Sequence, residues 1–497
     1  MKRKVLALLL TASMAMTALA GCGGSSGDAA APASEAAEAA SEAAAEEAPA
    51  EEAAEEEAAE EEAPASEAAE APAAEAGGDN VINLWSFTDE VPNMVKKFKE
   101  THPDFPYEVK ETIIATTDGA YQPALDQALQ SGGADAPDMY CAEAAFVLKY
   151  TQGDMASFAA PYEDLGIDVE NEIKEADIAQ YSVDIGTNPD GKVVGLGYQA
   201  TGGAFIYRRS IAKDVWGTDD PETVAEKIGA GSDSWDQFFA AAEELKAKGY
   251  GIVSGDGDIW HAVENSSDQG WIVDGKLNID PKREAFLDLS KQLYDNDYMN
   301  DTQDWQDAWF ADMKGEGTKQ IFGFFGPAWL INYTIAPNCG GEAVGEGTYG
   351  DWAVCAPPIG FFWGGTWVLA NNNSAKKEAV GEIIDWITLN CTEDGLQYMW
   401  ANGTLNGEGG TKDCVASGTV MAMSNGELDF LGGQNMFDAF VPANQYANGK
   451  NLTQYDETIN LKWRDQVRAY VHGEKSRDEA IASFKTDVAD NLDVEVE

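Results

Sequence analysis

The chain has 497 residues and carries 87 Asp and Glu against 32 Lys and Arg, which gives a formal net charge of -55 at neutral pH. So acidic a chain repels phosphates, and this argues against a nucleic-acid-binding role. All 14 Trp, 17 Tyr and 19 Phe lie after residue 80, so the folded body begins there and is long enough for two domains.

The N-terminus has the pattern of an export signal. Lys2, Arg3 and Lys4 precede an apolar run that is too short for a comfortable membrane span and ends at small residues before Cys22. Leu-Ala-Gly-Cys at 19–22 resembles the bacterial lipobox, in which the cysteine is acylated. We therefore predict a lipoprotein signal peptide at 1–21 and a lipid anchor on Cys22. An ordinary secretory signal with a chance cysteine is the alternative.

The next segment, 22–79, is predicted to be an acidic, Ala/Glu-rich disordered tether. Residues 23–78 contain 16 Glu and one Asp, with no basic and no aromatic residue. Such a composition cannot bury enough apolar surface to offset the entropy of ordering the chain. A coil of this length spans about 40 Å, which is enough to hold a domain clear of a membrane while keeping it nearby.

The body begins with strands that alternate with helices. Apolar patterning predicts strands at 81–85, 107–114 and 138–141, with helices over 91–98 and around Leu125 and Leu129. This order predicts a parallel sheet, whose ligands bind beyond the carboxyl ends of the strands, here the loops after Trp85 and Cys141. Further helices are expected at 235–248, 282–296, 374–388 and 456–473, and a further strand at 364–370.

Few motifs point to catalysis or metal binding. The three histidines are isolated, and no nucleotide-binding fingerprint occurs in the folded body, so we predict no metal and no cofactor. The five body cysteines lack CxxC spacing. Pairs of Cys391 with Cys414 or of Cys339 with Cys355 are possible, and buried free thiols are at least as plausible. Acidic residues are so abundant that a glycosidase pair could be nominated almost anywhere.

Tryptophan is the unusual feature of the body. Eight of these residues lie in segments that look like loops or strand ends, and most of them are within two residues of Gly, Asp, Asn or Gln: Trp85, Trp260, Trp271, Trp305, Trp309, Trp329, Trp363 and Trp367. A sugar presents apolar CH faces and a belt of hydroxyl groups, so its site needs flat rings with polar groups at their edges. Any single tryptophan could instead fill core volume. Trp386, at apolar spacing in the 374–388 helix, is assigned to the core.

The order of these features resembles family 1 extracellular solute-binding proteins, the maltose-binding-like class of carbohydrate ABC transporter subunits. The resemblance covers residues 80 to 497, and its most specific segments are 193–213, 322–329, 364–386 and 473–480. It implies an α/β, two-lobed, periplasmic-binding-protein-like fold of class II type, with a hinge and an interlobe ligand cleft. We expect an N-terminal lobe from 80–199 and 364–420, and a C-terminal lobe from 200–363 and 421–497.

The resemblance also implies hinge crossings near 198–201 and near 364–366, where closure must change backbone torsions. Trp329 matches the family's stacking tryptophan, with one residue more than the usual Gly-Pro-Trp. Thr201 stands where the best-known sugar binders carry an acid that contacts the ligand. The candidate ligand-binding residues are Trp85, Thr88, Asp89, Glu143, Tyr198, Thr201, Trp260, Trp329, Trp363 and Trp367, with Trp305 and Trp309 as weaker nominations.

The expected function is binding without catalysis. By resemblance, a monomer held at the outer face of the cytoplasmic membrane by its lipid anchor captures a sugar, most plausibly an oligosaccharide. It then delivers the sugar to permease subunits driven by a cytoplasmic ATPase. Two alternatives stay open: the same fold capturing a polyamine or another cationic solute, and a lipoprotein glycosidase. Several unpaired carboxylates in the cleft would favour the cationic solute.

Overall fold

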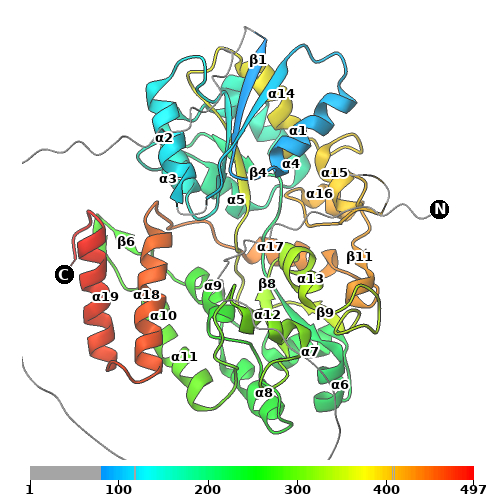
Figure 1. Cartoon of the computed structure of the whole chain (residues 1–497), viewed down its shortest axis with the longest axis vertical. Helices are drawn as coiled ribbons and strands as arrows, with labels where there is room; N and C mark the ends of the chain where they lie inside the picture. The colour runs from blue at the N-terminus through cyan, green and yellow to red at the C-terminus, as the bar shows by residue number, and fades with distance from the viewer. Residues whose placement is uncertain (1–79, 117–118, 406, 408, 497) are drawn as a thin grey trace, which may run out of the picture. The chain divides into compact units, whose positions relative to one another are not determined.

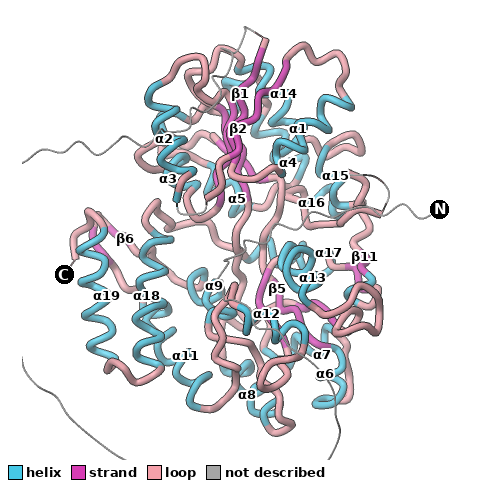
Figure 2. Tube along the Cα trace, viewed as in Figure 1, coloured by secondary structure: helices cyan, strands magenta, loops and turns pink. Residues whose placement is uncertain are grey.

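The computed structural model describes residues 80–496, apart from 117, 118, 406 and 408. The predicted signal peptide, Cys22 and the whole of the predicted tether lie outside the described residues. Two β-sheets, each covered by helices, organise the described part of the chain (Figures 1 and 2). The fold is a two-lobed α/β fold of the periplasmic-binding-protein type, as predicted.

The first sheet has five strands in the order β2-β1-β3-β10-β4. Its strands are β1 (Val81–Ser86), β2 (Glu108–Ile113), β3 (Met139–Glu143), β4 (Gly195–Gly197) and β10 (Thr366–Ala370). Strands β1, β2 and β3 are parallel, and β10 runs antiparallel to both of its neighbours. The predicted parallel sheet is therefore confirmed for its first three strands, and a late strand is inserted beside them.

Helices cover both faces of this sheet. Met139 and Cys141 of β3 face one hydrophobic cluster, while Tyr140 and Ala142 face another. Helices α1 (Glu90–Thr101) and α14 (Lys377–Thr388) contribute to the first cluster, and α2 (Tyr121–Ser131), α3 (Val147–Thr151) and α5 (Gln180–Gly186) to the second. Burial on both faces explains why β3 and β10 are apolar over nearly their whole length, whereas β2 at the edge of the sheet alternates with charged residues.

The second sheet has three antiparallel strands in the order β8-β5-β9. They are β5 (Ala204–Arg208), β8 (Gly323–Gly326) and β9 (Trp352–Cys355). Phe205 and Tyr207 face a second lobe-specific core, to which α8 (Asp236–Lys246), α9 (Gly257–Asn265), α11 (Phe286–Asp295), α18 (Asp456–Val471) and α19 (Arg477–Asn491) contribute. The predicted 282–296 helix is divided into α10 (Pro281–Glu284) and α11.

The remaining elements are shorter or peripheral. The helices are α4 (Val169–Ala176), α6 (Arg209–Trp216), α7 (Pro221–Ile228), α12 (Asp307–Lys314), α13 (Ala336–Asn338), α15 (Leu396–Ala401), α16 (Gly418–Ala422) and α17 (Phe437–Tyr446). The strands are β6 (Ile272–Val273), β7 (Lys276–Leu277), β11 (Glu427–Leu428) and β12 (Gln434–Asn435), and a π-helical turn covers Leu330–Ile335. Within residues 80–496, none of the helices has the length and apolar character that spanning a bilayer requires.

Two sequence-based assignments concern individual core residues. Trp386, a residue of α14, is buried in the core, as predicted. The five body cysteines are free thiols, so neither suggested disulfide forms.

Candidate functional site

The two segments that connect the sheets lie side by side. One joins β4 to β5, and the other joins β9 to β10. The N–H of Gly203 donates to the carbonyl of Phe361 at 2.8 Å, and the N–H of Trp363 donates to the carbonyl of Thr201 at 3.0 Å. Beyond Trp363, Gly364 and Gly365 have φ values of 72° and 114°, which favour glycine. The paired crossings therefore fix where the side chain of Trp363 emerges.

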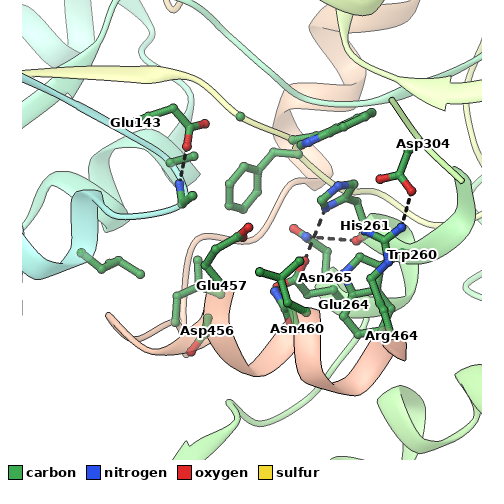
Figure 3. Close-up of a pocket in the computed structure, with 18 of the residues that line it drawn as sticks. Glu143, Trp260, His261, Glu264, Asn265, Asp304, Asp456, Glu457, Asn460 and Arg464 are labelled. Atoms are coloured by element: carbon green, nitrogen blue, oxygen red, sulfur yellow. Dashed lines mark hydrogen bonds and ion pairs between the residues drawn. The ribbon is translucent and has the colours of Figure 1, made fainter. Parts of the chain in front are cut away.

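A cavity of about 310 Å³ lies beside the crossings. Its lining combines the end of β3, the start of α3, helix α9, the Asp304–Trp305 loop, the second crossing and helix α18. Figure 3 shows Glu143 on one side of this cavity and Trp260, His261, Glu457 and Arg464 on the other. The carboxyl end of a strand of the first sheet therefore faces two helices that pack with the second sheet.

A second cavity, of about 300 Å³, adjoins the first and shares Glu143, Trp305, Trp363 and Gly364 with it. Trp329 and Tyr333 complete its aromatic wall, and Glu90 and Gln199 are among its polar residues. Together the two cavities have several aromatic rings in their lining, among them Trp305, Trp329 and Trp363.

Three tryptophans form the aromatic wall where the cavities meet. The ring centroids of Trp329 and Trp363 are 4.9 Å apart with an interplanar angle of 67°, and Trp305 lies 5.9 Å from Trp363. On its other side, Trp363 stacks on the His261 ring at 4.6 Å and 25°. Trp305 is 49% exposed and has a φ of 66°, a conformation that is costly for a residue other than glycine. Exposed, strained aromatic residues of this kind occur at functional sites.

The polar lining is dominated by carboxylates. Arg464 forms an ion pair with Asp304, and the Nδ1 atom of His261 lies 3.5 Å from Glu264. Glu143 accepts a backbone hydrogen bond from Ala145 at 2.7 Å, and burial raises its pKa to about 7. Burial also raises the pKa of Glu457. No group of residues within the described part of the chain is arranged to bind a metal ion.

The structure brings four of the candidate residues together. Glu143, Trp260 and Trp363 line the first cavity, and Trp329 lines the second. Trp260 is 1% exposed and packs against Phe286, so little of its ring is available.

The other six candidates do not line these two cavities. Trp367 is buried, and its Nε1 donates to the Ser182 carbonyl at 3.1 Å. Tyr198 is buried and donates to Glu90, while Thr201 is buried against Tyr181 and Gly364.

Trp85 packs against the first lobe's core. Thr88 and Asp89 are exposed, and Asp89 lines a separate cavity with Trp400. The weaker nomination Trp309 is buried, with its Nε1 donating to Asp258.

Residues of helix α18 were missed by sequence reasoning. Glu457, Asn460 and Arg464 all line the first cavity. Their spacing of three and four residues places them on one helix face, which is the signal that could have identified them. His261 and Glu264 share one face of α9 at a spacing of three residues, which is a signal of the same kind, whereas Asp304 lies in a loop and had no comparable pattern.

Comparisons with known proteins agree with this geometry. A family model described as bacterial extracellular solute-binding protein matches residues 85–390. No curated protein matches the chain in sequence.

Solved structures share the fold at low identity. A structure described as extracellular solute-binding protein family 1 has a TM-score of 0.66 at 18% identity, covering 82% of this chain and 99% of that one. The galacto-N-biose/lacto-N-biose I-binding protein of the ABC transporter from Bifidobacterium longum, in complex with lacto-N-biose, has a TM-score of 0.60 at 19% identity, covering 85% and 100%. The sugar-binding protein MalE from Xanthomonas citri has a TM-score of 0.59 at 14% identity, covering 82% of this chain and 96% of that one.

Because the family model matches more than half of the length of this chain, the chain belongs to the bacterial extracellular solute-binding proteins.

Proposed function

We propose that this protein is the lipid-anchored, carbohydrate-capturing subunit of an ABC importer, and that it binds its ligand without catalysis. The observation that carries the proposal is the wall formed by Trp305, Trp329 and Trp363 beside Glu143 in the two adjoining cavities. Flat rings bordered by hydrogen-bonding groups suit the CH faces and hydroxyl groups of a sugar. The fold of sugar-binding transport proteins, which this chain shares, adds support.

In this proposal, one lobe comprises 80–199 and 364–420, and the other comprises 200–363 and 421–497. The ligand holds the lobes together because some of its contacts form only when both lobes reach it, so binding shifts the population towards the closed state. The bound sugar, an oligosaccharide, is then presented by a monomeric protein to a permease pair driven by a cytoplasmic ATPase.

The anchor places this event at the outer face of the cytoplasmic membrane. Cleavage after residue 21 leaves Cys22 to carry the lipid, and segment 22–79 links it to the body. The role of this segment is to keep the binding protein near the transporter.

Isothermal titration calorimetry with a panel of mono- and oligosaccharides tests the proposal. We expect saturable binding of at least one sugar, with oligosaccharides binding more tightly than their monosaccharide units. Failure of every sugar to bind would refute the carbohydrate assignment. Release of reducing sugar during incubation would instead indicate a glycosidase and refute binding without catalysis.

One observation favours the second candidate, a polyamine or another cationic solute. The carboxylates of Glu143 and Glu457 line the same cavity, and neither forms an ion pair with a described basic residue. Spermidine and putrescine therefore belong in the same titration panel.

A further inference from the structure

Glu143 is a carboxylate without a counter-charge. It is the last residue of β3, and its Oε2 accepts the N–H of Ala145 at 2.7 Å. Among the described residues, none of the Lys, Arg or His side chains forms an ion pair with it. Burial is the main reason why its pKa rises to about 7, and the negative charge of Glu457 adds to the effect. Ionising Glu143 therefore has an energetic cost, which a cation beside it would offset.

Glu457 is a second carboxylate and belongs to the opposite wall, where the nearby charges of His261 and Arg464 only partly offset the effect of burial, so that its pKa is still raised. It lies in the first turn of α18 and points into the cavity that Glu143 faces (Figure 3). Within the described part of the chain, its side chain has neither a hydrogen bond nor an ion pair. Like charges on the two walls oppose any closer approach of those walls.

The basic groups of the cavity are already engaged. Arg464 is paired with Asp304, and His261 faces Glu264. Asp456, which is 6% exposed, also lines the cavity; its Oδ1 accepts hydrogen bonds from Thr453, and its Oδ2 has no partner. A buried acceptor without a partner and two carboxylates outside any ion pair suit a donor-rich, positively charged ligand group.

The ring faces limit which cation fits. Trp363 and Trp305 offer flat surfaces that attract both sugar CH groups and cations. Asn265 adds a side-chain oxygen without a hydrogen-bond partner, which can accept from a hydroxyl group. A linear polyamine would also neutralise the carboxylates and could place a cation over a ring, but it covers less of each broad ring face than a sugar ring does.

We infer that the ligand is an amino sugar: a carbohydrate whose protonated amine lies between Glu143 and Glu457 while its ring packs on Trp363. The inference rests on the proposed carbohydrate-binding function and narrows its substrate class. The ammonium group removes the repulsion between the two walls, so ligand charge contributes to closure as well as to affinity.

A matched pair of ligands tests this inference. Calorimetry at near-neutral pH and low salt compares a β-1,4-linked glucosamine oligosaccharide with its N-acetylated counterpart of equal length. The free-amine form should bind at least about tenfold more tightly, because hydrogen bonds to a charged group are stronger than those between neutral groups. Glu143→Gln and Glu457→Gln, which keep side-chain size, should each reduce this preference to less than about threefold.

The control is Glu222→Gln, which removes one charge from an exposed position on α7 and should leave the preference unchanged. Equal or tighter binding of the N-acetylated form, or a preference that survives both cavity substitutions, would overturn the inference. Binding of neutral sugars alone would overturn it while leaving the carbohydrate function intact. Binding of spermidine without any sugar would overturn both.

Discussion

The indole Nε1 of Trp329 donates a hydrogen bond to the backbone carbonyl of Trp363 at 3.0 Å. Trp329 follows β8, whereas Trp363 belongs to the crossing that leads into β10. The bond therefore fixes the position of one aromatic wall relative to the two glycines at the end of the crossing. Because the ring is already held in place, little side-chain entropy is lost when a ligand binds to it.

Replacing Trp329 by Ala should weaken sugar binding by at least about 1 kcal/mol, or roughly fivefold, because a stacking face is lost. Calorimetry with the tightest-binding sugar measures the change. Trp216→Ala is the control, since Trp216 ends α6 and donates to Glu244 away from the cavities. If Trp329→Ala binds as tightly as the unmodified protein, Trp329 does not belong to the site.

Replacing Trp305 by Gly should weaken sugar binding more than it changes the stability of the folded protein. The left-handed backbone of Trp305 costs a residue other than glycine about 1 to 2 kcal/mol, and its ring is half exposed. In Trp305→Gly, relief of this strain opposes the greater freedom of glycine in the unfolded chain, so stability should change by less than about 1 kcal/mol. Sugar affinity should fall by more than that.

Denaturant unfolding without ligand and calorimetry with ligand separate these two effects. Asp274→Gly provides the comparison, because Asp274 has a φ of 50° in the hairpin between β6 and β7. That variant should retain full affinity. A large loss of stability in Trp305→Gly would contradict the view that Trp305 is held in place for binding.

The strands and helices were predictable where their patterning is local. The strand at 138–141 was recognisable because both faces of β3 are buried, which makes the whole segment apolar. The sequence could not show which of Trp363 and Trp367 faces the cavity and which is buried, since both stand near Gly364 and Gly365. In the structure, Trp367 lies within β10 and points towards Ser182, whereas Trp363 precedes the glycines and faces the cavity.

The residues of α18 that line the site were missed for a different reason. Glu143 and Glu457 are separated by more than 300 residues and meet only because the chain returns to the cavity through α18. Charged residues are common in surface helices, so Glu457 looked like any solvent-facing position. Only the packing of α18 against α11 and α19 shows which of its faces remains for the cavity.

The folded protein should lose stability as the pH rises from about 5 to about 7. Six carboxyl groups have a pKa raised to about 6 or 7: Glu143, Asp258, Asp312, Asp385, Asp413 and Asp456. Burial is the main cause in each, and the neighbouring Glu172 adds to it at Asp385. In this range the folded state holds more protons than the unfolded state, so the free energy of unfolding falls with rising pH and levels off above about pH 7.

Calorimetric melting temperatures across this range should fall by roughly 5 °C or more. Each kcal/mol of lost stability lowers the melting temperature of a unit of roughly 150 to 250 residues, the size of one lobe, by about 2 to 4 °C. Asp385→Asn mimics the protonated form and should make the dependence shallower. The exposed Asp295→Asn should leave it unchanged. A melting temperature that rises over this range would contradict the assignment of these raised pKa values.

Replacing Cys22 by Ala should release the protein from the membrane without changing its ligand affinity. The acyl chains contribute about 0.8 kcal/mol per buried CH₂ group to anchoring, and all of the residues that line the proposed site come after residue 89. Fractionation of cells that express the full chain measures the release, and calorimetry on the released protein measures the affinity. Cys391→Ala, which removes a half-buried free thiol of the body, is the control and should stay with the membrane. Membrane retention of the Cys22→Ala variant would show that Cys22 does not carry the anchor.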